Sequence, residues 1–176
     1  MSIKAVKLLK GIFAFTATLL ILYGVRFLWQ NHSITMPLYE ELMSINGVQN
    51  VVVKKTAKVH EPINISISLG SVSNFQKTYT EINEKVVQAL KDKPYEIDIK
   101  GNENEELENL YSNISLYVEK SLIDGSFPSL VEKSQELAKA ADSAVSITID
   151  DEYIYIYISK GDNALYKLVS RQSRSR

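Results

Sequence analysis

One apolar stretch, residues 11–29, limits what this chain can fold into more than any other feature. It reads GIFAFTATLLILYGVRFLW, and Arg26 is its only charged residue. Nineteen residues at a rise of ~1.5 Å give a helix about 28 Å long, close to the roughly 30 Å hydrocarbon core of a bilayer. The stretch therefore predicts a single transmembrane helix, preceded by a basic tail (1–10) and followed by a short polar tether (30–35).

The residues at the two ends of this stretch predict its orientation. Lys4, Lys7 and Lys10 precede it, whereas Arg26 and Trp29 stand near its other end. Lysines accumulate on the cytoplasmic side, while aromatic rings and long cationic side chains reach the headgroup layer. We therefore expect these five residues to lie at the membrane interfaces, in contact with lipid. The expected location is the cell membrane, with the N-terminus cytoplasmic and the C-terminal domain extracytoplasmic.

A cleaved signal peptide is the alternative interpretation of the same stretch. Signal peptidases require small residues at the cleavage site. Residues 22–27 read LYGVRF, which is bulky and charged. The sequence therefore favours an uncleaved signal-anchor.

Composition narrows the class of protein further. The chain has no cysteine and a net charge of −1. The first fact excludes a disulfide framework and thiol chemistry, and the second gives no reason to expect nucleic acid as a partner. An extracytoplasmic domain without disulfides is typical of a bacterial surface.

Beyond the tether, apolar periodicity predicts one α+β domain over residues 36–170, with a sheet packed on helices. Its expected order is αββαβ followed by ααβββ, with a sub-boundary near 101–104 and a frayed basic tail at 171–176. Residues 63–99 form a βαβ unit, which normally has parallel strands. Ser73 with Gln76, and Ser129 with Glu132, have the spacing of capping boxes at two helix starts.

The segment DEYIYIYISK, residues 151–160, alternates tyrosine with isoleucine. Tyr153, Tyr155 and Tyr157 share one face, which admits two interpretations: cross-strand packing of the rings, or a platform for a glycan or protein partner. A last strand over 165–169 is expected to cover the edge of 153–160. A soluble fragment, 34–176, should then be monomeric; an edge left open could instead pair with another copy in the membrane plane.

Candidate chemistry is sparse. His32 and His60 lie in polar connections without metal-ligand spacing, and the run NENEE at 102–106 suits a helix N-terminus better than a calcium loop. Residues 150–152, DDE, could supply paired carboxylates for hydrolysis, but acidic residues are common in hairpin turns. We therefore predict no catalytic, cofactor-binding or metal-binding residue. An interaction or scaffold protein is favoured over an enzyme, with a surface hydrolase or glycan-binding module as the alternative.

A family resemblance covers residues 36–99. Its marks are the motif Ser44-Ile45-Asn46-Gly47-Val48, the strand around Val51, the alternating strand 63–69, the amphipathic helix 74–91 and a strand opening at Tyr95. This pattern resembles the ring-building-motif domains of secretion-system basal bodies and sporulation channels. The resemblance implies an αββαβ fold beside a membrane anchor and side-by-side assembly into rings. It adds a ring-forming envelope-channel component, with another envelope protein as partner, to the expected functions.

Overall fold

The structure, a computed structural model, describes residues 15–22, 37–54 and 61–171. The chain divides into two parts, residues 1–38 and residues 39–176. In the first part residues 15–22 are helical, and their large apolar side chains are exposed, Leu20 by 71%. Within the described ranges no helix is both long enough and apolar enough to cross a bilayer. The rest of the predicted span, with Lys4, Lys7, Lys10, Arg26 and Trp29, lies outside the described residues.

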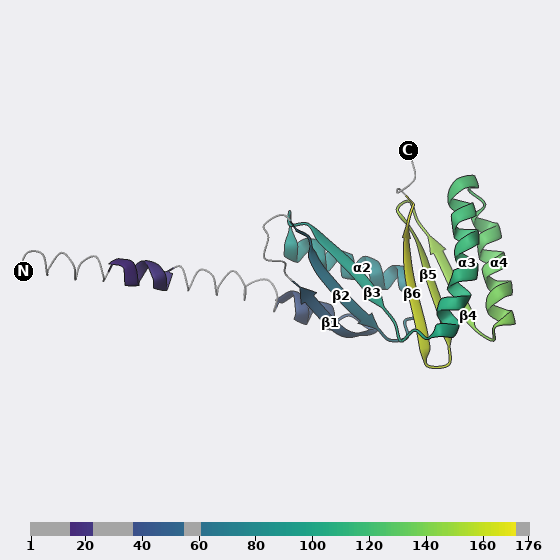
Figure 1. Ribbon diagram of the computed structural model, residues 1–176, viewed down its shortest axis with the longest axis horizontal. Coiled ribbons are helices and arrows are strands. Elements are labelled where there is room, and N and C mark those ends of the chain that lie inside the picture. The colour runs from purple at the N-terminus through teal and green to yellow at the C-terminus, as the bar shows by residue number, and fades with distance from the viewer. Residues whose placement is uncertain (1–14, 23–36, 55–60, 172–176) are drawn as a thin grey trace, which may run out of the picture. The chain divides into compact units, whose positions relative to one another are not determined.

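The second part is a mixed α+β structure with two three-stranded sheets. A helix over residues 37–43 precedes the first strand. The elements that follow, shown in Figure 1, are β1 (Val48–Lys54), β2 (Ile63–Leu69), α2 (Phe75–Leu90), β3 (Tyr95–Lys100), α3 (Glu105–Asp124), α4 (Phe127–Ala140), β4 (Ala144–Ile149), β5 (Tyr153–Lys160) and β6 (Asn163–Ser170). This order confirms the predicted sequence of helices and strands, and the predicted sub-boundary falls where the chain passes from β3 to α3.

The first sheet has the order β1-β2-β3 and contains the predicted βαβ unit. β1 is antiparallel to β2, and β2 is parallel to β3 with Ile65 opposite Ile97. Alternate residues of β2 are buried together with one face of α2, because a half-buried strand and an amphipathic helix each need an apolar partner. Tyr95 of β3 donates a hydrogen bond to Asn83 Oδ1 of α2 at 2.9 Å. The polar face of β2 is formed by Asn64, Ser66 and Ser68.

The second sheet is an antiparallel meander in the order β4-β5-β6. Ile154, Ile156 and Ile158 are fully buried on one face of β5, in a core shared with apolar residues of α3 and α4. Since β6 pairs along the whole of β5, from Tyr153 to Lys160, the last strand covers that edge as expected. Figure 1 shows α3 and α4 side by side on this side of the sheet.

The helix starts differ from the predicted capping boxes. Asn74 caps α2, since its Oδ1 accepts a hydrogen bond from Lys77 N at 2.9 Å. The Ser73–Gln76 box is therefore wrong, because asparagine is itself a strong N-cap and lies one residue further along. The Ser129–Glu132 box is also wrong: α4 starts at Phe127, with Pro128 in its first turn.

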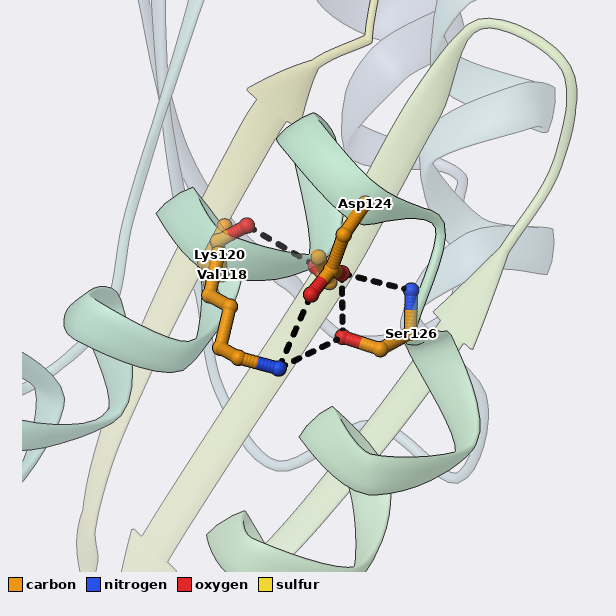
Figure 2. A network of polar contacts seen from close by, with 5 residues as sticks. Val118, Lys120, Asp124 and Ser126 are labelled. Atoms are coloured by element: carbon orange, nitrogen blue, oxygen red, sulfur yellow. Dashed lines mark hydrogen bonds and ion pairs between the residues drawn. The ribbon is translucent and has the colours of Figure 1, made fainter.

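A polar network closes the turn between α3 and α4 (Figure 2). The Asp124 carboxylate forms an ion pair with Lys120 Nζ at 2.8 Å and accepts a hydrogen bond from Ser126 N at 2.9 Å. It also accepts a hydrogen bond from Ser126 Oγ. The hydrogen bond from Lys120 is the largest of the effects that hold the pKa of Asp124 below its usual range. Gly125 caps α3 at φ 72°, a left-handed conformation that glycine adopts without strain. These contacts fix the helical hairpin that covers the isoleucine face.

Candidate functional site at the junction of the two sheets

The N-terminal turn of α2 contacts the tyrosine face of the second sheet. Phe75 lies with its ring centroid 5.0 Å from that of Tyr166 and 5.9 Å from that of Tyr155, and Tyr79 lies 5.8 Å from Tyr153. We call this group the tyrosine joint; its members are Phe75, Tyr79, Tyr153, Tyr155, Tyr157 and Tyr166. Such edge and tilted ring pairs each contribute about 0.5–1.5 kcal/mol beyond the burial of their area. The joint therefore links the two sheets through an aromatic contact.

Burial decides which of the predicted platform residues remain accessible. Tyr155 is only 3% exposed, as is Tyr166, whereas Tyr153 and Tyr157 are half-buried. Tyr157 stacks on Tyr166 with ring centroids 4.9 Å apart. Tyr155 is therefore not available as an open platform residue, because α2 of the same chain covers it. Only Tyr153 and Tyr157 keep part of their surface in solvent.

Asp150, at the turn before β5, holds this joint with one carboxylate. Its Oδ1 accepts hydrogen bonds from Glu152 N at 2.9 Å and Tyr153 N at 2.8 Å. Its Oδ2 accepts from Tyr155 Oη at 2.7 Å and from Gln76 Nε2 at 3.3 Å. One side chain thus connects the β4–β5 turn, strand β5 and helix α2.

The electrostatics follow from this geometry. Burial by itself would raise the pKa of Asp150, but the hydrogen bonds from Tyr155, Tyr153, Glu152 and Gln76 outweigh it and lower the pKa below its ordinary value. Burial, and next the hydrogen bond to Asp150, raise the pKa of Tyr155. At neutral pH the pair is therefore a carboxylate acceptor and a phenol donor. In this protonation state the phenol of Tyr155 donates to the carboxylate of Asp150.

The other two acidic residues of the turn are more exposed than Asp150. Asp151 and Glu152 are exposed, and Asp151 borders a shallow hollow of about 280 Å³ together with Phe127 and Arg171. The Arg171 guanidinium lies 4.9 Å from the Phe127 ring centroid and donates a hydrogen bond to the backbone oxygen of Asp150. Asp150 thus bonds to groups of its own chain, whereas Asp151 and Glu152 are exposed at the surface of the turn.

The acidic run 102–106 lies at the N-terminus of α3 and includes its N-cap. Asn104 caps this helix by accepting a hydrogen bond from Leu107 N at 3.0 Å, and Glu105, Glu106 and Glu108 occupy the first turn. This is the helix-terminus role predicted for the run, favoured by the macrodipole. Among the described residues, no group of three His, Cys, Asp or Glu side chains is placed to hold a metal ion. His32 and His60 lie outside the described residues.

A second contact joins the sheets near the end of β3. Ala164 N donates a hydrogen bond to Asn102 O at 3.3 Å, and Tyr166 Oη donates to Gly70 O. At Gly101 the backbone of β6 approaches so closely that an added Cβ would lie 2.0 Å from Ala164 O. A residue with a side chain therefore does not fit at this position without a backbone shift.

Sequence reasoning missed the α2 half of the joint. The amphipathic helix predicted over 74–91 has one apolar stripe, formed by Phe75, Tyr79, Ile82, Val86 and Leu90, and Gln76 was assigned to a capping box. The available signal was the composition of that stripe, which is aromatic in its first turns and aliphatic afterwards. The structure shows that the aromatic part contacts the second sheet.

Comparisons with known proteins add no relative: no family model, curated protein or solved structure matches this chain. Its function must be inferred from the joint, the turn and the surfaces that they leave free.

Proposed function

We propose that this chain is a single-pass membrane protein whose folded part lies outside the cytoplasm and acts as a rigid interaction or scaffold module. The observation that carries the proposal is the tyrosine joint with Asp150. In this joint, aromatic rings and a carboxylate hold the two sheets together. These are the kinds of group that would otherwise serve recognition or catalysis. In the described part of the chain, sheet edges and the polar face of β2 are among the surfaces that stay outward-facing and available to another protein.

The N-terminal residues support the membrane anchor in this proposal. The apolar run 11–29 is long enough to span a bilayer and is preceded by Lys4, Lys7 and Lys10. Its described portion, residues 15–22, is helical, with Phe15 68% and Leu22 61% exposed. An apolar helix with such exposed side chains is stabilised by a lipid environment.

The rival function, a surface hydrolase, would depend on the acidic turn. Asp150 already accepts four hydrogen bonds from its own chain. Asp151 and Glu152 are exposed. The geometry therefore supports a structural role for this turn better than an acid–base pair.

The order of elements favours one alternative function. The helix over 37–43 followed by β1, β2, α2 and β3 has the αββαβ order of the ring-building-motif domains that residues 36–99 resemble. A ring-forming envelope-channel component is therefore the second candidate. It stays second because α3, α4 and the second sheet have no counterpart in that pattern.

Single-cysteine labelling in intact cells tests the proposed topology. Because the chain has no native cysteine, Asp162→Cys, at the exposed β5–β6 turn, and Ser2→Cys, in the basic tail, report the two sides separately. We expect a membrane-impermeant maleimide to label Asp162→Cys on intact cells and Ser2→Cys only after lysis. The reverse pattern, or recovery of the full chain in the soluble fraction, would show the proposal to be wrong.

A further inference from the structure

The four sheet edges of the described residues differ in how they are protected. β1 has a register shift between Val48 and Asn50, and β3 carries three exposed charged residues, Glu96, Asp98 and Lys100. β6 carries Lys167 and is contacted at its start by the 101–102 segment. Bulges, charges and covering segments are the usual means by which natural proteins block strand addition at an edge.

β4 has none of these features. Its sequence, AVSITI, contains no charge and no proline, and its pairing with β5 runs without a register shift. Within the described part of the chain, no backbone group outside β5 bonds to this strand. Ala144 and Ser146 are exposed. An uncharged, regular strand of β-branched residues is a template for another strand.

The apolar side chains of β4 indicate that the sheet is incomplete at this edge. Val145, Ile147 and Ile149 pack on the same core as the isoleucines of β5 but remain only partly buried. Their cross-strand partners Ile158, Ile156 and Ile154 are fully buried. One further strand beside β4 would remove the remaining apolar surface from water.

We propose that this strand is β4 of a second copy of the chain, paired antiparallel across a two-fold axis to give a six-stranded sheet. The distribution of charge favours this partner and direction. Exposed Asp151 and Glu152 follow the Ile149 end of β4, whereas Lys139 and Asp142 lie near the Ala144 end. Antiparallel pairing separates the two acidic ends and places each at the Ala144 end of the other copy, which carries one cation, Lys139, and one anion, Asp142; parallel pairing would place the two acidic ends together.

With this pairing, the partner of the proposed scaffold is a second copy of the chain. The inference rests on the proposed function in one respect: membrane anchoring is needed to raise the local concentration of the chain. A single six-residue strand pair is a small interface, so the soluble fragment is expected to be monomeric at micromolar concentration. Anchoring raises the effective concentration to roughly millimolar. Self-association should therefore be seen for the full chain in a bilayer.

Disulfide scanning of the otherwise cysteine-free full chain in lipid vesicles tests the pairing. Single cysteines are placed in turn at positions 144 to 149, and Asn50→Cys on the exposed part of β1 is the control. Oxidation should give homodimers with a maximum at one or two positions, at least five-fold above the control. A flat profile, no homodimer, or a maximum at Asn50→Cys would overturn the proposal.

A variant that blocks strand addition at β4 distinguishes cross-linking through strand pairing from cross-linking through random collision. Ser146→Lys adds a charge at an exposed position of β4, and Asn50→Lys adds the same charge on β1. In the best cysteine background at a position other than 146, Ser146→Lys should lower cross-linking about ten-fold with an unchanged melting temperature, and Asn50→Lys should leave cross-linking unchanged. Equal cross-linking in both would refute β4 pairing. Because purified vesicles are used, this result is independent of the labelling in cells that tests the topology.

Discussion

Among single residues, Asp150 shows how a polar side chain can link three elements. Its carboxylate lies at 2.7–3.3 Å from four donors, which belong to the turn, to β5 and to α2. Hydrogen bonds to a charged acceptor contribute more than neutral ones, about 1.5–3 kcal/mol each in favourable cases. We therefore assign Asp150 a stabilising role in the fold.

We expect Asp150→Ala to lower the free energy of unfolding by about 2–4 kcal/mol, because it removes these bonds and leaves the Tyr155 hydroxyl without its acceptor. Asp151→Ala, at the exposed neighbouring position, is the matched control and should change it by less than about 0.5 kcal/mol. Urea unfolding followed by circular dichroism measures both. Equal effects would contradict the role assigned to Asp150.

The same variant has a predictable pH dependence. Since the folded-state pKa of Asp150 is lowered, its contribution is fully present above the unfolded-state pKa of about 3.9 and is lost as pH falls through the lower folded-state value. The difference between wild type and Asp150→Ala should therefore be constant from pH 7 to about pH 5 and shrink below pH 4. A difference that grows with acidification would contradict the assignment.

For single helices and strands, short-range patterns in the sequence predicted which segments become strands. Alternation in 63–69 gave the bounds of β2, and the tyrosine–isoleucine segment gave β5, because burial on one face of a strand has a period of two. The joint was not predictable in this way. The contact of Phe75 and Tyr79 with a sheet formed about 80 residues later in the chain depends on packing between elements, which residue spacing does not encode.

The contact between β3 and β6 gives a prediction at this scale. Gly101→Ala would place Cβ 2.0 Å from the backbone oxygen of Ala164, so the two strands must separate. We expect a loss of about 1–3 kcal/mol in the free energy of unfolding. Gly70→Ala is the control, because its Cβ would meet only the end of the flexible Gln49 side chain. Similar, small losses for both would show that the approach at Gly101 is not a constraint.

Across the folded part, residues 39–171, we expect the two sheets to move as one rigid body. The contacts that cross between them include the tyrosine joint with Asp150, the Tyr166–Gly70 bond, the Ala164–Asn102 bond and the Ser71 Oγ–Tyr157 Oη contact at 3.4 Å. A scaffold needs this rigidity, since a partner held at one sheet can be positioned relative to the other only if they do not move independently.

Native-state hydrogen exchange of the full chain measures whether the two sheets open together. The slowest amides of β2, around Ile65 and Ile67, and of β5, around Ile154 and Ile156, should open with the same free energy. Phe75→Leu, which removes the central ring of the joint, should lower both values together by about 1–3 kcal/mol. Amides of β2 that weaken while those of β5 keep their wild-type protection would show that the two sheets unfold separately.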